Sequence, residues 1–370
     1  MMSATDVLPQ TSRPLGSGHT RGEDSASEIR ATSSPRCLLC GGEGESLYRG
    51  LVDRLFGAPG LWNVVRCPNQ ACGLLWLDPM PVAQDIGKAY ARYYTHTVEA
   101  DARRAGRLRR LLHEMKEAHQ SIVYGYPSNH GSVRRRVLGR TLRLFPVRRG
   151  AADNDVRFLD AHPGGLVLDV GCGTGEWLLA MQGRGWNVEG IEFDEDAVAV
   201  ARGLGLEVRS GSLEQQHYPA ESFDAVTLSH VIEHVPDPAA TIAECSRVLK
   251  HGGKLVIATP NTASLSHRFF GRSWRGLEPP RHLSILSMQS LRRALEIAGF
   301  QGVVLHPQFA PRLVHESVLL SKGVLDHSAM LQRRDLVASL SARAFSALEV
   351  PLVGVRPHLA DCMTAVARKD

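Results

Sequence analysis

The sequence predicts an α/β protein with a doubly wound, Rossmann-like parallel sheet, preceded by a small four-cysteine ribbon. Three observations support this fold class. From residue 151 to 310 short apolar segments alternate with helix-forming segments, as in a parallel sheet with crossover helices. A glycine-rich turn at 171–175 follows an apolar strand and opens a helix. Two closely spaced cysteine pairs lie near the N-terminus.

The composition is that of an ordinary globular protein with two or three domains. The chain has 370 residues, of which 43% are hydrophobic and 22% charged, and a formal net charge of +5. Residues 1–35 are rich in Ser, Thr, Gly and charge, which predicts a disordered tail and no signal peptide. The apolar stretch 336–355 is interrupted by Arg343 and Glu349, so we expect no transmembrane segment and a cytoplasmic protein.

The first folded unit, residues 36–82, is too short to bury a core of its own. It carries two cysteine pairs, each followed by a glycine, whose thiolates can converge on one ion: Cys37, Cys40, Cys67 and Cys72. This pattern predicts one structural zinc, because a closed four-thiolate site leaves no position for water. The alternative is four unpaired cysteines. The other three cysteines are interpreted as small hydrophobic residues.

Residues 83–150 form a helical linker or cap with crowded arginines. Such runs are mostly solvated helix faces. Contact with an acidic surface is the alternative, whether membrane headgroups, a phosphorylated substrate or nucleic acid.

Residues 151–370 then supply the large sheet. Its strands are expected near 166–170, 187–192, 206–209, 223–228, 253–258, 301–306 and 361–368. An insertion at 311–358, before the last strand, has helical periodicity. It should pack on the sheet or on a second subunit, which leaves a homodimer open; peripheral membrane contact is the less favoured reading.

The glycine turn indicates a ligand held close to the backbone. Gly171, Gly173 and Gly175 permit a sharp turn and a close approach. Asp169 at the end of the preceding strand would repel a phosphate but attract a cationic or amino-acid-bearing ligand. Glu192 ends the next strand, where an acid accepts hydrogen bonds from ribose hydroxyls. Together these residues predict an adenosine ligand without phosphates.

These motifs resemble class I S-adenosylmethionine-dependent methyltransferases. The resemblance covers five ordered blocks, namely the glycine loop, the ribose acid, 211–214, 223–238 and 249–261. It implies a seven-stranded sheet whose last strand is antiparallel, and S-adenosylmethionine as cofactor. The cofactor-binding residues that it implies are Asp169, Gly171, Cys172, Gly173, Gly175, Glu192, Phe193, Ser212, Leu213, Ser229 and His230. Ser212 departs from the pattern, since many relatives carry Asp there.

Methyl transfer requires an acceptor placed opposite the methyl group, with its proton removed where necessary. Candidate catalytic residues are His230, Glu233 and His234, after the fourth strand, and His282 in the loop 274–283. His282 is the preferred base and His234 the next. The spacing of His230 and His234 predicts a shared helix face. Two other interpretations are that these histidines only line and pack the site, or that they bind a divalent metal.

A second resemblance concerns the acceptor. The ribbon, the loop 274–283 and the group Tyr93, Tyr94 and His96 are similar to bacterial methyltransferases found with glycan and secondary-metabolite enzymes. It implies methylation of a hydroxyl, or of a carbon, in a small molecule such as a sugar, polyketide or lipid-linked intermediate. An RNA- or ribosome-modifying enzyme is disfavoured because the fourth strand ends in Leu-Ser-His. A cofactor-binding module without activity is the third alternative.

Overall fold

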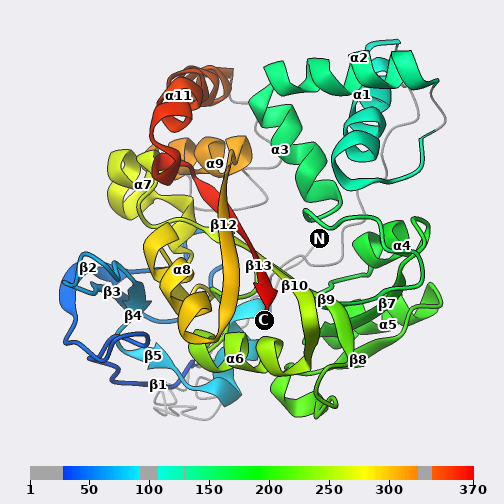
Figure 1. Cartoon of the computed structure of the whole chain (residues 1–370). Helices are drawn as coiled ribbons and strands as arrows, with labels where there is room; N and C mark the ends of the chain where they lie inside the picture. Colours follow the sequence, from blue (N-terminus) through cyan, green and yellow to red (C-terminus); the bar gives the residue numbers. More distant parts are fainter. Residues whose placement is uncertain (1–27, 92–106, 129–130, 324–335) are drawn as a thin grey trace, which may run out of the picture.

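A computed structural model of the chain describes residues 28–91, 107–128, 131–323 and 336–370. A large mixed sheet forms the centre, with helices on both faces and the ribbon at one side (Figure 1). The predicted fold class is confirmed.

The central sheet has seven strands in the order β12-β13-β10-β9-β6-β7-β8. They are β6 (Leu166–Val170), β7 (Asn187–Glu192), β8 (Val208–Ser210), β9 (Phe223–Ser229), β10 (Leu249–Pro260), β12 (Phe300–Gln308) and β13 (Cys362–Lys369). The strands from β8 to β10 are parallel, and β13 is inserted antiparallel between β10 and β12, as expected.

Successive side chains of a strand point to opposite faces of the central sheet, and helices cover both faces. Val167 and Val256 point to one side and pack with α4 (Glu176–Gln182) and the residues after α1 (Arg107–Tyr124). Leu168 and Ile257 point to the other side and pack with α6 (Pro238–Val248), α8 (Met288–Ile297) and the ribbon. Both faces are therefore buried, which a parallel sheet requires.

The remaining helices lie around the sheet. They are η2 (Ala83–Tyr90), α2 (Ser132–Thr141), η3 (Leu142–Leu144), α3 (Pro146–Asp155), α5 (Glu195–Gly203), η4 (Glu214–Gln216), α7 (Leu265–Phe270), η5 (Gly271–Ser273), η6 (Arg275–Leu277), α9 (Pro311–Ser321), α11 (Leu336–Val355) and η7 (Pro357–Leu359). Two of these helices, α9 and α11, lie within residues 311–358 and contact each other.

The ribbon shares a sheet with the second half of the chain. Its four strands lie in the order β11-β4-β3-β2, namely β11 (Ser284–Ile285), β4 (Leu75–Leu77), β3 (Trp62–Arg66) and β2 (Glu45–Leu51). β11 follows directly after the loop 274–283 and pairs antiparallel with β4. One hydrophobic cluster contains both Trp76 of the ribbon and Phe223 of the central sheet. The loop 274–283 is therefore tied to the ribbon through backbone hydrogen bonds.

One expectation needs correction. The predicted disordered tail was 1–35, but β1 (Ala31–Thr32) pairs antiparallel with β5 (Met80–Pro81), so residues from 31 on belong to the fold; 1–27 lie outside the described residues.

One helical stretch among the described residues, Val337–Val355, is long and apolar enough to span a bilayer by length and composition. A single stretch of this kind is weak evidence, so it does not overturn the expectation of no transmembrane segment.

The glycine turn offers a direct test of the local fold. Gly173 and Gly175 both have positive φ, at 55° and 81°. A Cβ at Gly173 would meet no atom within 4 Å, whereas one at Gly175 would overlap Leu206 Cδ1 and lie 3.2 Å from Ala201 Cβ. Gly175 is thus required by backbone conformation and by packing, and Gly173 by conformation alone.

We expect Gly175→Ala to lower the free energy of unfolding by about 3 kcal/mol, because it adds overpacking to backbone strain. Gly173→Ala, the matched control, should lower it by about 1 kcal/mol. Urea denaturation of both variants measures the difference. Equal losses would contradict the packing of the turn against α5.

Candidate active site

The glycine loop covers a buried acidic residue. Asp169, at 0% exposure, accepts hydrogen bonds at Oδ1 from the Arg157 guanidinium and from Thr227 Oγ1, the latter at 2.9 Å. Its Oδ2 atom is buried without a hydrogen-bond partner among the described residues. Burial raises the pKa of Asp169, and the charge of Arg157 opposes this shift. An unpartnered buried acceptor below a glycine loop fits a ligand that donates hydrogen bonds, such as an ammonium group.

Arg157 places a cation at the same position. Its guanidinium stacks on Trp177 at 3.8 Å from the ring centroid and is 14% exposed. A guanidinium held by an aromatic ring and one carboxylate keeps donors for a second carboxylate. Asp169 and Arg157 can therefore bind an amino-acid group of a ligand from two sides.

Glu192 ends β7 beside the glycine loop. Its Oε2 accepts from Gly173 N at 2.8 Å, and its Oε1 accepts from Phe193 N at 2.8 Å and Asp194 N at 3.0 Å. Three backbone donors fix the carboxylate next to the turn. Its oxygens retain acceptor capacity for the hydroxyls of a ribose.

The other predicted cofactor residues lie around the same strand ends. Gly171 N and Cys172 N both donate to Ile191 O, which joins the loop to β7. Phe193 is 62% exposed directly after Glu192. Ser212 N donates to Gln215 Oε1 at 2.9 Å, and its neighbour Leu213 is buried.

The region after β9 differs from the prediction of a helix. Ser229 is the last residue of β9, His230 follows with φ +56°, and α6 begins only at Pro238. His230 and His234 therefore do not share a helix face, because this segment is a turn that stops before Pro236. His230 Nδ1 lies 3.2 Å from Glu233 Oε1, and the His230 ring is 54% exposed.

Glu233 is fully buried, so it does not face an acceptor directly. Its Oε2 accepts from Thr259 Oγ1 at 3.0 Å. Burial raises the pKa of Glu233, but the hydrogen bond and charge of His230 outweigh this and lower it to about 2. The ionised carboxylate positions His230 and joins the ends of β9 and β10.

His234 and His282 lie side by side, with ring centroids 4.7 Å apart. His282 Nδ1 lies 2.6 Å from Gly276 O, and His234 Nδ1 lies 3.0 Å from Arg281 O and 2.9 Å from Tyr90 Oη. Because a carbonyl oxygen only accepts, Nδ1 carries a proton in both rings, and His282 Nε2 lies 3.6 Å from Glu278 Oε2. Burial and the neighbouring His234 lower the pKa of His282 to about 4, so this ring is neutral at pH 7.

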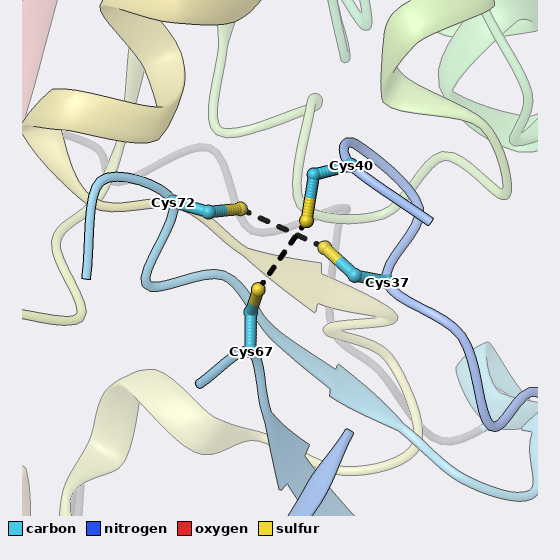
Figure 2. A group of neighbouring side chains, drawn as sticks. All are labelled: Cys37, Cys40, Cys67 and Cys72. Carbon is cyan, nitrogen blue, oxygen red and sulfur yellow. Dashed lines mark hydrogen bonds between the residues drawn. The ribbon is translucent and has the colours of Figure 1, made fainter. Parts of the chain in front are cut away.

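Within the described residues, two groups of side chains could hold a metal. One ligand atom each of Glu233, His234 and His282 lies within 4.8 Å of the others. The four ribbon cysteines also converge, with Cys37 Sγ 3.6 Å from Cys72 Sγ and Cys40 Sγ 3.4 Å from Cys67 Sγ (Figure 2). They come from two turns that each contain a positive-φ glycine, Gly41 and Gly73. The convergence of all four thiols on one point fits a tetrahedral ion.

A buried ionic cluster holds the loop 274–283 in place. Arg281, at 0% exposure, donates from Nη1 to Asp53 Oδ2 at 2.8 Å and to Ala89 O at 2.9 Å, and from Nε to Glu278 Oε1 at 2.8 Å. Glu278 also pairs with Arg275, whose Nε lies 2.9 Å from Glu316 Oε2 on α9. The cluster therefore connects the ribbon, η2, the loop and the insertion.

The sequence analysis missed four residues of this site. Arg157 and Thr227 pair with Asp169, Tyr90 contacts His234, and Arg281 anchors the loop. Thr227 could have been predicted from the sequence, because a polar residue inside an otherwise apolar strand usually has a buried hydrogen-bond partner. The other three carry no local signal. Tyr93, Tyr94 and His96 lie outside the described residues.

The fold and site define an α/β domain built for an adenosine ligand with an amino-acid end. Residues 139–305 match the family model of a methyltransferase domain. These residues, which are less than half of the chain, therefore form a methyltransferase domain, and the similarity to S-adenosylmethionine-dependent methyltransferases lies in this part. The sequence-based recognition of this class is confirmed.

Individual relatives match over this part of the chain. The ubiquinone biosynthesis O-methyltransferase of Hahella chejuensis is 43% identical over 116 residues, which are 30% of this chain and 49% of that protein. The ubiquinone biosynthesis O-methyltransferase of Pseudomonas aeruginosa strain UCBPP-PA14 is 40% identical over 114 residues, 29% of this chain and 49% of that protein. The chain thus spans about half the length of these curated relatives.

Among solved structures, an S-adenosylmethionine-dependent methyltransferase from Thermotoga maritima is 20% identical, covers 64% of this chain and 97% of its own, and has a TM-score of 0.40. This structural likeness is weak.

The buried, neutral His282 predicts a pH dependence of stability. Its pKa is about 4 in the folded chain against an ordinary value of 6.5. As the pH falls below 6.5, the unfolded chain gains a proton at this ring that the folded chain does not bind, so folding loses stability. We expect the free-energy difference between wild type and His282→Asn to shrink from about pH 6.5 to about pH 4.5. Urea denaturation across this range measures it.

The control is Leu61→Ala, which alters an exposed side chain without a titratable group and should run parallel to wild type. If His282→Asn also ran parallel to wild type, the ring would not be held neutral in the fold.

Proposed function

We propose that the chain is an S-adenosylmethionine-dependent O-methyltransferase that acts on a hydroxyl of a small molecule. The proposal of an acceptor site rests on two neighbouring imidazoles, His234 and His282, whose Nδ1 atoms are bonded to backbone carbonyls near the carboxyl ends of β9 and β10. The names of the relatives, which are O-methyltransferases of ubiquinone biosynthesis, also favour transfer to oxygen.

The cofactor side of the site suits S-adenosylmethionine. When bound, this cofactor supplies an electrophilic methyl group on a sulfonium. Asp169 Oδ2 would accept from its ammonium group, Arg157 would pair with its carboxylate, and Glu192 would hold its ribose. Open space beside Gly173, which a Cβ would fill, lets the ligand approach the backbone.

The acceptor proton would pass to a histidine. The lowered pKa of His282 keeps its ring neutral at neutral pH, so the ring is available to accept a proton. Its bond to Gly276 O fixes the ring, and His234 and Tyr90 form the adjacent wall. We therefore assign His282 as the general base, with His234 next to it and His230 and Glu233 as the positioning pair. The loop and η2 would exclude water from the reacting atoms.

We expect two variants to separate these roles. Calorimetry should show S-adenosylmethionine binding in the micromolar range for wild type and an affinity roughly tenfold lower for Glu192→Gln, because a ribose hydroxyl loses a charged partner. His282→Asn should keep the affinity of wild type but transfer labelled methyl to a screened set of phenolic and sugar hydroxyl acceptors about 10²- to 10⁴-fold more slowly.

Glu195→Gln, an exposed carboxylate three residues beyond Glu192, is the control for cofactor binding. Absence of binding by wild type would overturn the proposed function. Wild-type turnover in His282→Asn would remove this residue as the base, while loss of activity on a chelation that leaves the ribbon zinc bound would favour a metal at Glu233, His234 and His282.

We further propose that the ribbon within residues 36–82 binds one structural zinc at Cys37, Cys40, Cys67 and Cys72, ahead of the linker 83–150 and the methyltransferase unit 151–370. The support is the convergence of four sulfur atoms from two turns, with no position left for substrate. Such an ion would contribute folding free energy to this small unit, in addition to the sheet and the hydrophobic cluster that it shares with the rest of the chain.

Elemental analysis should find about one zinc per chain in wild type and almost none in Cys72→Ser, with a lower Tm in the variant. Cys245→Ala, which changes a buried cysteine of α6 outside the cluster, should keep its zinc. A metal-free wild type purified without chelator would refute the zinc site.

A further inference from the structure

The outer face of α11 is apolar and exposed. Five large residues on it are between 44% and 81% exposed, namely Val337, Leu340, Leu348, Leu352 and Val355. Only 22% of the stretch Val337–Val355 is buried in the fold. A globular protein surface rarely presents so many large apolar side chains on one helix without a partner.

The apolar surface continues onto a second segment. Leu144, Phe145 and Val147, from η3 and the start of α3, are 76%, 48% and 36% exposed. Phe145, Val147 and Val350 of α11 line a common shallow hollow. α11 and α3 also lie at the same end of the molecule in Figure 1. The two segments therefore form one apolar surface.

The charges on these segments are of one sign. No Asp or Glu occurs between residues 132 and 152, and the single acidic residue of α11, Glu349, is 1% exposed. Exposed arginines flank the apolar residues, namely Arg140, Arg143, Arg148, Arg149, Arg343 and Arg356. This combination of apolar and exclusively basic exposed residues is typical of a surface that contacts anionic lipid headgroups and acyl chains together.

A spanning role for α11 fits less well than a surface role. Its inner side is packed in the fold, where Ala338 is 0% and Val353 2% exposed. On the same side Glu349 shares a buried site with Asp361, and burial, together with the neighbouring carboxylate, raises the pKa of Glu349 to about 8. Crossing a bilayer would remove these contacts and place the carboxyl in lipid. Only the outer face is available.

Nucleic acid is also a poorer occupant. An RNA backbone would use the arginines but would leave the exposed Leu340, Leu348 and Leu352 without a partner.

We propose that α11, together with η3 and the start of α3, docks the protein on an anionic membrane surface. The outer side chains of α11 enter the headgroup region and the arginines contact lipid phosphates. This docking is independent of the methyl-transfer chemistry, and it would bring the protein to acceptors carried on a lipid.

The test is co-sedimentation of the full chain with vesicles of phosphatidylcholine and phosphatidylglycerol, compared with vesicles of phosphatidylcholine alone. Wild type should bind the anionic vesicles, and added salt should weaken the binding. Leu348→Ser combined with Leu352→Ser should lower the affinity at least tenfold, and Arg143→Gln combined with Arg148→Gln roughly tenfold. The controls are Ile297→Ser, which changes a residue 71% exposed on α8, and the exposed Arg293→Gln, also on α8.

Circular dichroism of the surface variants should match wild type, because the changed side chains are exposed. No binding to anionic vesicles, or equal binding by all variants, would overturn the proposal. Sedimentation velocity tests whether a second copy of the chain binds this face instead. If wild type were a dimer without lipid binding, and Leu348→Ser with Leu352→Ser made it monomeric, the face would be a dimer interface and the membrane proposal would be rejected. The membrane proposal would also be rejected if the protein bound no vesicles but bound a random RNA in a salt-sensitive way, with the same affinity in wild type and in the leucine variants.

Discussion

The placement of the ribbon, η2 and the loop 274–283 relative to one another depends on the buried guanidinium of Arg281. It contacts Asp53 of the ribbon, the backbone of Ala89 in η2 and Glu278 in the loop, and it lies over the ring of Phe56 at 4.6 Å. A buried charge is costly unless it is paired and hydrogen-bonded, so the three parts must be in place together for Arg281 to be tolerated. The ribbon, the linker and the loop are thereby fixed relative to the ends of β9 and β10. This constraint gives His282, one residue further on, a defined position.

The proposed cofactor half and the proposed acceptor half of the site are built in different ways. The proposed cofactor residues belong to the carboxyl ends of β6 and β7 and depend on local features, a glycine turn and an acidic strand end. The proposed acceptor residues come from segments distant in sequence, with Tyr90 and His234 in contact 144 residues apart. The same cofactor half can thus be combined with different acceptor halves. In this chain the acceptor half is built by the ribbon and the loop, where we expect substrate specificity to reside.

Sequence patterns predicted the features that depend on local order. All seven strands of the central sheet, the antiparallel last strand and the cysteine cluster were predicted, because apolar periodicity and residue spacing are local signals. The ion pair of Arg281 with Asp53, 228 residues apart, and the pairing of β11 with β4 have no such signal. His230 was placed on a helix because its spacing from His234 suits one, but the turn before Pro236 prevents it. The exposed face of α11 shows a further limit, since periodicity cannot tell whether an apolar side is covered.

The claim that the ribbon and the acceptor loop form one cooperative unit is tested most directly by native-state hydrogen exchange in increasing urea. Leu77 N donates to Leu283 O at 3.0 Å across the strand pair, and Leu283 N donates to Glu233 O at 2.8 Å in the acceptor site. The account predicts that these two amides exchange through one opening, with equal free energies and equal dependence on urea. If the Leu77 amide exchanged through a separate, lower-energy opening while the Leu283 amide remained protected, the ribbon would unfold independently and the claim would be contradicted.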